Sequence, residues 1–540
     1  MQELRDQETI GEVWAQTVRR HRQNAFIAVP ANKDRHYLPD GYEITYGDAD
    51  RHIGKICDAF TKAGFGPGHR VALLLENQPE HFLYRLALNV LGVSCVPINP
   101  DYRPAEIAYL LEHSEPELVL AVASRAAQLK EGLAASGHRP PVRFVGDDEP
   151  LPPPRTPRRS LAVTPTSESC ILYTSGTTGR PKGCIISHGY EVAMGERYIT
   201  IGEPAQIATG DRIYNPLPLY HLNSGVVSLM GAILSGSCQV QPDRFHPERW
   251  WREVAETRAS VVHYLGVVIQ MLMLQPPSAA DRQHRVRFGF GAGVEPQLHA
   301  AFEARFGFPL VEVWGMTEFC RVLATAGAPD RKVGTRAFGY SRPGLEAKVV
   351  DDADRDVPDG TPGELVVRHS AATPRRGAFS GYLKNPEETE KGWRGGWWHT
   401  GDTVYRAADG MLHFVDRKKN IIRRSGENIA AAEVEALLLT HPNVAQAAVL
   451  AVKDEVREEE VLACIVLKAG TGDRATAEDI FRFANERLAY YKPPGWIYFT
   501  RELPTTGTQK IQKHTIFPGI ADPRTVPGMI DLRHLKRRDR

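Results

Sequence analysis

The chain has 540 residues, too many for a single hydrophobic core, which predicts roughly two to four domains or subdomains. Its 66 basic and 65 acidic residues nearly balance, which argues against a nucleic acid or an anionic membrane as partner. Seven cysteines without a C-x-x-C pair, and no apolar run long enough to span a bilayer, predict a soluble cytoplasmic protein with reduced thiols.

Helix and strand patterns alternate between residues 45 and 145. Helices are predicted at 48–63, 80–91 and 104–113, and strands at 70–75, 93–98 and 118–122. This alternation is typical of an α/β fold with layered, largely parallel sheets. A connector rich in proline and arginine, residues 150–160, follows this region.

The next stretch, YTSGTTGRPKG at 173–183, is predicted to form a strand, a loop and a strand. Its glycines let backbone N–H groups approach a ligand closely, and hydroxyls and a lysine add further donors. These residues are Tyr173, Thr174, Ser175, Gly176, Thr177, Thr178, Gly179, Lys182 and Gly183. The set suits a nucleotide phosphate. A surface turn would explain the glycines but not the lysine, and the P-loop pattern fails because Lys182 precedes Gly183 rather than Ser or Thr.

This loop resembles the phosphate loop of the adenylate-forming superfamily, which includes acyl-CoA synthetases, luciferases and the adenylation domains of peptide synthetases. Taken alone, His221 in the segment NPLPLYHLNSG is a satisfied interior histidine. A histidine in a similar segment of that superfamily lies near the carboxylate and the phosphate loop. The resemblance therefore places His221 at the junction of acyl group and adenylate.

Two further motifs follow in the family's order. The segment Gly291-Ala292-Gly293 resembles the loop that lies along the adenine face, although an ordinary turn between strand and helix explains its glycines equally well. The string WGMTE at 314–318 resembles the family's Y-G-x-T-E, with Trp314 replacing the usual tyrosine and its hydroxyl. The resemblance implies that Thr317 contacts the α-phosphate and that Glu318 holds Mg²⁺.

Turn residues and short strands between 333 and 367 predict a small β-barrel that closes the large domain. The motifs GYLKNPEET at 381–389 and GWWHTGD at 396–402 then match the family in order and spacing. By that match Asp402 accepts hydrogen bonds from the ribose hydroxyls, and Arg417 also contacts the ribose. A surface turn is the alternative for Thr400-Gly401-Asp402.

The pattern changes after residue 416. Helices predicted at 431–439 and 477–488, with strands at 444–452 and 461–467, indicate a small α+β domain. We therefore expect a large domain at 1–416, a hinge at 417–420, a small mobile domain at 421–520 and a basic tail at 521–540, whose closing residues 533–540 are expected to be disordered. The resemblance implies that Lys419 is the hinge residue and that the loop at Gly426 lines a channel for a thiol.

The last motif, LPTTGTQKIQK at 503–513, resembles the family's P-x-T-x-x-G-K-I loop, with Gln509 in place of a glycine. In the family the lysine of this loop, here Lys510, is the adenylation catalyst. An ammonium that reaches both the substrate carboxylate and the α-phosphate neutralises charge as it builds in the transition state. Lys510 is therefore the predicted catalytic residue, together with Glu318, Thr317 and His221.

Together the motifs imply an acid–thiol ligase that uses ATP, Mg²⁺ and coenzyme A, and they look closest to crotonobetaine/carnitine-CoA ligases and related acyl-CoA synthetases. The residues expected around the acid are mostly apolar or aromatic and include no lysine or arginine, which predicts a monocarboxylic acid. Transfer to an amine or to a separate carrier protein stays open, as does a homodimer. A non-catalytic nucleotide-binding relative is disfavoured because Glu318, Asp402, Arg417 and Lys510 are all present.

Overall fold

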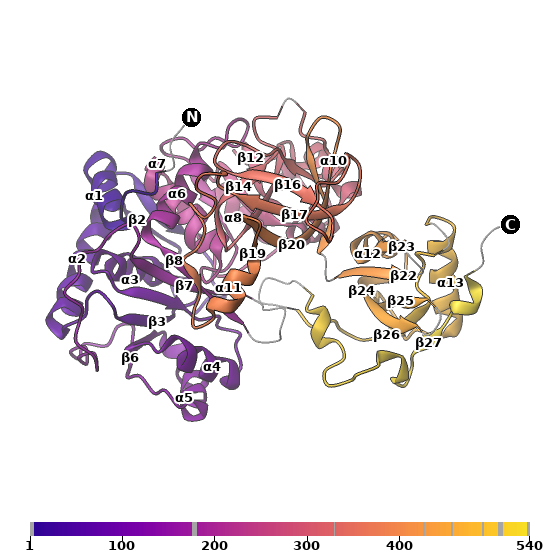
Figure 1. The fold of residues 1–540 in the computed structure, drawn as a ribbon. Coiled ribbons are helices and arrows are strands. Elements are labelled where there is room, and N and C mark those ends of the chain that lie inside the picture. The colour runs from indigo at the N-terminus through magenta and orange to yellow at the C-terminus, as the bar shows by residue number, and fades with distance from the viewer. Residues whose placement is uncertain are drawn as a thin grey trace. The chain divides into compact units, whose positions relative to one another are not determined.

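The computed structural model describes residues 5–174, 181–328, 330–417, 420–424, 427–454, 457–488, 491–505 and 511–536. The chain divides into two compact units (Figure 1). The large unit contains residues up to Ala347 together with Val367–Trp398, and the small unit contains Lys348–Val366 and the residues from His399 onward. The domain limits expected from the sequence, including the hinge at 417–420, stay predictions, because Lys418 and Lys419 lie outside the described residues.

The first sheet of the large unit has seven strands in the order β18-β8-β7-β4-β3-β5-β6. Its strands are β3 (Arg70–Leu74), β4 (Ser94–Pro97), β5 (Leu118–Ala121), β6 (Val142–Phe144), β7 (Glu168–Thr174), β8 (Lys182–Ser187) and β18 (Gly381–Tyr382). Pairing is parallel from β7 to β6, whereas β8 pairs antiparallel with both β7 and β18. The largely parallel α/β layer predicted from the sequence is confirmed.

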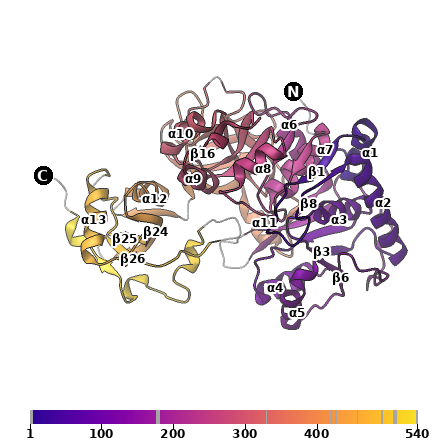
Figure 2. The same cartoon turned by 180° about the vertical axis from the view of Figure 1, so that it is seen from behind.

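Helices connect these parallel strands, as a crossover requires. They are α3 (Pro79–Val90), α4 (Pro104–Ser114) and α5 (Ala126–Ala135). The helix α2 (Tyr46–Ala63) leads into β3, and α1 (Ile10–His21) packs against α2 and α3 (Figures 1 and 2). Thr45 caps α2 by accepting a hydrogen bond from the Asp48 N–H, and Gly64, with φ of 96°, ends it in the left-handed conformation that glycine adopts without strain.

The second sheet of the large unit has eight strands in the order β14-β13-β12-β11-β9-β10-β1-β2. They are β1 (Ala25–Val29), β2 (Tyr42–Thr45), β9 (Arg212–Tyr214), β10 (Cys238–Val240), β11 (Val261–Leu265), β12 (Phe288–Ala292), β13 (Leu310–Met316) and β14 (Phe319–Ala324). The pairs from β13 through β1 are all parallel. The carboxyl ends of these strands therefore meet at one edge, the place where open α/β sheets bind ligands.

Helices of this half include α6 (His188–Ile199), α7 (Leu229–Ser235), α8 (Trp250–Glu256), α9 (Gly266–Leu274) and α10 (Pro296–Phe306). A π-helical turn at Asn223–Ser228 precedes α7. Single π turns inside helices are frequent at functional sites. This turn lies two residues after His221.

The region predicted as a β-barrel, 333–367, contributes β15 (Ala337–Gly339), β16 (Glu346–Val350) and β17 (Gly363–Arg368) to a sheet. The sheet also contains β20 (Trp397–Arg406) and β21 (Leu412–Arg417), with β19 (Trp393–Arg394) beside β20, and its strands lie in the order β15-β21-β20-β17-β16. In the described part of the chain this order does not return to its start, so these strands form an open sheet where a closed barrel was predicted.

The small unit is an α+β domain, as predicted. It contains β22 (Ile421–Arg424), β23 (Glu427–Ala430), β24 (Val444–Asp454), β25 (Glu458–Leu467), β26 (Trp496–Phe499) and β27 (Ile530–Asp531). The helices α12 (Ala431–Leu438) and α13 (Arg474–Asn485) pack on one face of this sheet through Val434, Leu438, Ile480 and Phe481. No described helix of the whole chain is both long and apolar enough to cross a membrane.

The disorder expected for the closing residues 533–540 is wrong for residues 533–536, the described part of that segment. Ile530 pairs with Ile497 of β26, and Leu532 is fully buried in the core of the small unit. Lys536 Nζ lies 2.5 Å from Glu460 Oε1, and Arg424 Nε donates to the other oxygen of the same carboxylate at 2.7 Å. Burial lowers the pKa of Lys536 to about 8. A buried acidic residue far away in the sequence thus orders a segment whose basic composition indicates disorder.

Candidate active site

The predicted phosphate loop joins β7 to β8 in the seven-stranded sheet. Thr174 and Lys182 form the last pair of this hairpin, and Ser175, Gly176, Thr177, Thr178 and Gly179 lie outside the described residues. The Thr174 hydroxyl lies 4.0 Å from Cys184 Sγ. The structure thus fixes both ends of the loop on a rigid hairpin in the large unit.

Lys182 is held by an acidic residue of a helix distant in sequence. Its Nζ lies 2.7 Å from Glu388 Oε2 and 4.9 Å from the centre of the Tyr382 ring. Glu388 is in the first turn of α11 (Pro386–Gly392), and its backbone N–H is capped by the Asn385 side chain. The hydrogen bond from Lys182 holds the pKa of Glu388 below its ordinary value. An anion that enters the loop therefore meets a lysine already held in position.

Glu318 occupies the two-residue turn between β13 and β14, directly after Thr317. Its carboxylate accepts a hydrogen bond from the Tyr382 hydroxyl at 2.7 Å, and its side chain is largely buried. The Glu318 carbonyl accepts from the Phe379 N–H at 2.9 Å. Burial and the Glu318 charge raise the pKa of Tyr382, so its hydroxyl stays protonated and donates at neutral pH.

Thr317 and Trp314 belong to the same strand end. The Thr317 carbonyl accepts a hydrogen bond from the Tyr190 hydroxyl of α6 at 2.9 Å, which fixes the backbone of the turn. Trp314 is buried, and its ring centre lies 6.4 Å from that of Phe338. The turn that carries Thr317 and Glu318 is thus held from α6 and from β18 at the same time.

The glycine segment 291–293 ends β12 at the carboxyl edge of the eight-stranded sheet. A Cβ on Gly291 would lie 2.2 Å from the Tyr264 carbonyl oxygen, so only glycine fits there. Gly293 has a φ of 84°, and its N–H donates to Glu312 Oε2 at 3.1 Å. The Glu312 carboxyl also accepts from the Tyr264 hydroxyl at 2.8 Å. Burial raises the pKa of Glu312 to about 7.

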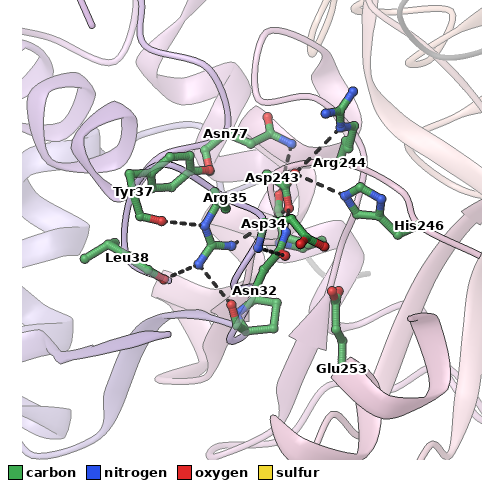
Figure 3. A network of polar contacts seen from close by, with 12 residues as sticks. Asn32, Asp34, Arg35, Tyr37, Leu38, Asn77, Asp243, Arg244, His246 and Glu253 are labelled. Atoms are coloured by element: carbon green, nitrogen blue, oxygen red, sulfur yellow. Dashed lines mark hydrogen bonds and ion pairs between the residues drawn. The ribbon is translucent and has the colours of Figure 1, made fainter. Parts of the chain in front are cut away.

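The segment that carries His221 is held in place by hydrogen bonds from Asn77. The Asn77 amide donates to the Leu217 and Pro242 carbonyls and accepts from the Leu219 N–H at 3.0 Å. Figure 3 shows Asn77 beside a network in which Arg35 donates to backbone carbonyls, while Asp243 accepts from His246. Burial opposes the charge of Asp243, but His246 and Arg35 keep its pKa below the ordinary value. Asn77, which is far from His221 in the sequence, thus fixes the backbone of residues 217–219 before His221.

His221 itself turns back toward its own segment. Its N–H donates to the Pro218 carbonyl at 3.1 Å, its carbonyl accepts from the Gly225 N–H at 2.9 Å, and its ring lies 4.5 Å from that of Tyr220. Burial lowers the pKa of His221 to about 4, so the imidazole is neutral at pH 7. The role of His221 at the junction of acyl group and adenylate stays a prediction.

The predicted ribose residues belong to the small unit. Asp402 lies in β20 and pairs in register with Arg417 of β21. Its side chain is largely buried and its N–H donates to the Thr400 hydroxyl at 3.1 Å, so a surface turn at 400–402 is excluded. The Arg417 side chain, Lys419, Gly426 and Lys510 lie outside the described residues.

Sequence reasoning did not single out Tyr382, Glu388 or Glu312 as functional. Tyr382 and Glu388 lie inside the GYLKNPEET motif, which gave a signal, but the motif does not say which side chain faces Glu318 or Lys182. Glu312 lies two residues before Trp314 and gave no separate signal, because its partners come from β11 and from the end of β12.

Comparison with known sequences places these motifs in one family. The sequence model of the AMP-binding enzyme family matches residues 11–383, and that of the AMP-binding enzyme C-terminal domain matches residues 433–510. The chain is 32% identical to a sulfoacetate–CoA ligase of Cupriavidus necator, over 91% of this chain and 96% of that protein. It is 30% identical to a crotonobetaine/carnitine–CoA ligase of Shigella flexneri, over 86% of this chain and 92% of that protein.

Solved structures share the fold at lower identity. ATP-bound MatB from Rhodopseudomonas palustris superposes with a TM-score of 0.77 at 23% identity, covering 94% of this chain and 98% of that one. The o-succinylbenzoate CoA synthetase of Bacillus subtilis in complex with its acyl-adenylate gives 0.79 at 21% identity, covering 96% and 99%. Together with the two family matches, these similarities confirm the resemblance to adenylate-forming enzymes: the chain belongs to the AMP-binding enzyme family.

Proposed function

We propose that the chain is an AMP-forming carboxylate–CoA ligase, an acid–thiol ligase that activates a carboxylic acid with ATP and passes the acyl group to coenzyme A. The observation that carries the proposal is the turn at Thr317-Glu318, whose carboxylate is held by Tyr382 in a chain that matches both parts of the family. Both named relatives are CoA ligases, and ATP-bound structures share the fold.

In the first half-reaction the acid's carboxylate attacks the α-phosphorus of ATP, giving an acyl-adenylate and pyrophosphate. The loop between Thr174 and Lys182 binds the phosphates, and the Lys182 ammonium balances part of their charge. The Thr317 hydroxyl contacts the α-phosphate. Lys510 neutralises the charge that builds between the carboxylate and the α-phosphorus.

Glu318 fits the requirements of a magnesium ligand. Mg²⁺ in nucleotide enzymes is bound through one or two carboxylates together with substrate phosphates rather than by an all-protein cage. Among the described residues no group of three metal-binding side chains is present, and Glu318 offers one carboxylate whose orientation Tyr382 fixes. When bound, the ion supplies positive charge to the phosphate oxygens.

The second half-reaction needs a different arrangement of the small unit. Asp402 and Arg417 bind the ribose, and rotation about Lys419 removes Lys510 from the site and brings the loop at Gly426 to line the thiol channel. The thiol of coenzyme A then attacks the acyl carbonyl and releases AMP. The adenine lies along Gly291, Ala292 and Gly293, with Trp314 nearby and His221 at the acyl junction.

The substrate is a monocarboxylic acid of small to medium size, aliphatic or aromatic. The relatives named for sulfoacetate and for crotonobetaine or carnitine support a small acid. The balance of 66 basic and 65 acidic residues supports small-molecule partners rather than nucleic acid. A homodimer and a cytoplasmic location stay predictions.

Product analysis tests the proposed function. The protein is incubated with ATP, Mg²⁺, coenzyme A and a panel of carboxylic acids, and AMP, pyrophosphate and thioester are measured. The proposal expects equal amounts of the three products with at least one acid. Pyrophosphate and AMP without thioester would favour the alternative function, transfer to an amine or a carrier protein. One protein that shares the fold, McbA, is an amide bond synthetase. ADP and phosphate, or no turnover with any acid, would contradict the proposal.

A further inference from the structure

Four polar side chains form a connected relay at the carboxyl edge of the eight-stranded sheet. Asn215 follows β9, His263 lies in β11, Asn223 opens the π turn and Tyr198 comes from α6. Tyr198 Oη lies 2.7 Å from His263 Nε2, and His263 Nδ1 lies 2.7 Å from Asn223 Oδ1. Asn215 Nδ2 lies 2.9 Å from Asn223 Oδ1. None of these residues was singled out by the sequence motifs.

The hydrogen-bond partners fix the orientation of both amides. The Leu217 N–H donates to Asn215 Oδ1 at 3.0 Å, so the other end of the Asn215 amide must be its NH₂ group. That NH₂ group donates to Ser228 Oγ at 2.8 Å and to Asn223, so the atom of Asn223 that faces it is the oxygen. An acceptor at Asn223 in turn requires that His263 carry its proton on Nδ1 and accept the Tyr198 hydroxyl at Nε2.

The relay is electrically neutral. His263 is fully buried, and burial lowers its pKa to about 3. Tyr198 is fully buried as well, and burial raises the pKa of its hydroxyl. The Phe290 ring packs against both, with ring centres 5.1 Å from His263 and 4.7 Å from Tyr198. Every polar atom of His263 and Tyr198 is therefore satisfied without a charge.

Asn223 differs from the other three because it is only partly buried and keeps a donor group in reserve. Its oxygen accepts two hydrogen bonds, from Asn215 and His263, whereas its Nδ2 has no partner among the residues that the structure describes. With the oxygen held on one side, the NH₂ group is directed to the other side. A structural role explains the two bonds to the oxygen but leaves the donor unused.

The position of Asn223 in the fold indicates which ligand its Nδ2 group would face. It lies two residues after His221, and its partner His263 pairs in register with Phe290, one residue before Gly291 of the proposed adenine loop. Ligands of open α/β sheets bind outside these carboxyl ends. The next residue of β11, Tyr264, faces the opposite side of the sheet and binds Glu312. His263 therefore faces the α6 side, where it binds Tyr198.

We propose that the Asn223 Nδ2 group donates a hydrogen bond to an oxygen carried on the chain of the acid substrate. This inference rests on the proposed function and narrows its substrate class: the acid bears a neutral oxo or hydroxyl oxygen in addition to the carboxylate that reacts. Asn223 then recognises the substrate, and Asn215 and His263, which bond its side-chain oxygen directly, are positioning residues that hold its amide in one orientation.

The test compares acids of matched shape in ATP–pyrophosphate exchange. The pairs are 4-oxopentanoate with pentanoate, and 4-acetylbenzoate with 4-ethylbenzoate. In the pair that the enzyme uses best, the oxygen-bearing acid is expected to have a kcat/KM at least about tenfold higher, because the donor would otherwise be left unpaired. The KM for ATP stays the same within a pair.

The decisive variant is Asn223→Asp. It keeps an oxygen that accepts from Asn215 and His263, but it replaces the donor by a second acceptor. We expect it to lose the preference for the oxo acids by at least about tenfold. The preference for 4-hydroxybutanoate over butanoate is expected to survive, because a hydroxyl can donate to a carboxylate. Thermal unfolding of the variant checks that the protein is folded.

Tyr198→Phe is the matched control. It breaks the far end of the relay and leaves the bond between His263 and Asn223 in place, so the preference is expected to change less than about threefold. A wild-type preference for the unsubstituted acid of each pair overturns the inference, as does an Asn223→Asp variant that loses both acids of a pair equally. Exchange without discrimination overturns this inference alone, whereas absence of exchange with every acid overturns the proposed function on which it rests.

Discussion

The two polar clusters of the large unit differ in how they treat charge. On the phosphate side, Glu318, Lys182 and Glu388 are ionisable residues held by Tyr382 and by each other, and they come from three separate chain segments. On the acyl side, the relay from Tyr198 to Asn215 contains no formal charge, since burial keeps His263 neutral.

The difference follows from what each cluster would bind. A triphosphate brings its own charge, so its site needs cations and a carboxylate for a metal ion. An acyl chain enters a region without water, where an unpaired charge costs far more than a neutral amide that keeps one donor for the substrate. We therefore expect substitutions on the phosphate side to lower turnover for every acid, and substitutions on the acyl side to change which acid is used.

The largest effect is expected at Lys510, the charge assigned to the first half-reaction. Lys510→Ala should lower the adenylation rate by at least about a hundredfold, on the order of 3 kcal/mol, because the variant loses the ammonium proposed to neutralise the charge that builds between carboxylate and α-phosphorus. ATP–pyrophosphate exchange measures this step. Thioester formation from supplied acyl-adenylate should fall much less. Lys453→Ala, at an exposed lysine of the same unit, is the control and should change neither rate. Equal losses in both half-reactions would show that Lys510 acts elsewhere.

Glu318→Gln should have the next largest effect. Glutamine can still accept the Tyr382 hydroxyl but lacks the charge that a magnesium ion needs, so adenylation should fall by roughly thirtyfold, about 2 kcal/mol. The concentration of Mg²⁺ that gives half-maximal exchange should rise. Glu390→Gln, on the exposed side of α11, should leave both quantities unchanged. A Glu318→Gln enzyme with the normal magnesium requirement would remove Glu318 from the metal site.

Lys419→Pro probes the proposed hinge. Proline fixes φ where rotation is required, so adenylate formation should stay within about threefold of normal while transfer to coenzyme A falls by at least about tenfold. Single-turnover measurements of the two steps separate them. Loss of both steps together, or of neither, would make Lys419 an ordinary surface lysine.

Glu312 is a buried carboxyl that belongs to neither cluster, since it binds Tyr264 and Gly293. The smallest effect on turnover is expected from its substitution. Burial raises its pKa from 4.5 to about 7, so the folded state binds more protons than the unfolded state between these values. Stability from this group is therefore fully present below pH 4.5 and is lost as the pH rises through about 7.

Glu312→Gln does not titrate and supplies the reference for this effect. The free energy of unfolding of the native protein, measured relative to that of the variant, should fall by up to about 3 kcal/mol between pH 4.5 and about pH 8. Urea unfolding of both proteins across that range gives the difference. Parallel pH profiles would mean that Glu312 is ionised throughout.

Much of the fold could be predicted from the sequence because its elements have a strong hydrophobic period. Helices α2, α3 and α4 begin and end within two residues of the predicted limits. The strand, loop and strand around Thr174 and Lys182 were predicted from a motif of contiguous residues.

The partners of these residues could not be predicted in the same way. Tyr382 lies 64 positions after Glu318, and only the pairing of β18 with β8 brings it there. The relay depends on Asn215, Asn223 and His263 on three separate elements, and the segment around His221, which contains Asn215 and Asn223, does not indicate their shared partner His263. The prediction of disorder failed at residues 533–536 for a similar reason. Their composition is basic, but Glu460, buried in β25, gives Lys536 a partner.

The central claim is that the acid's carboxylate attacks the α-phosphorus of ATP, and the transfer of an oxygen isotope tests it most directly. The acid with the highest turnover is labelled with ¹⁸O in both carboxylate oxygens. The protein converts it to thioester with ATP, Mg²⁺ and coenzyme A, and mass spectrometry measures the ¹⁸O content of the products. Attack at the α-phosphorus places one ¹⁸O in each AMP and none in pyrophosphate. Unlabelled AMP, or ¹⁸O in inorganic phosphate together with ADP, would contradict an acyl-adenylate mechanism for this chain.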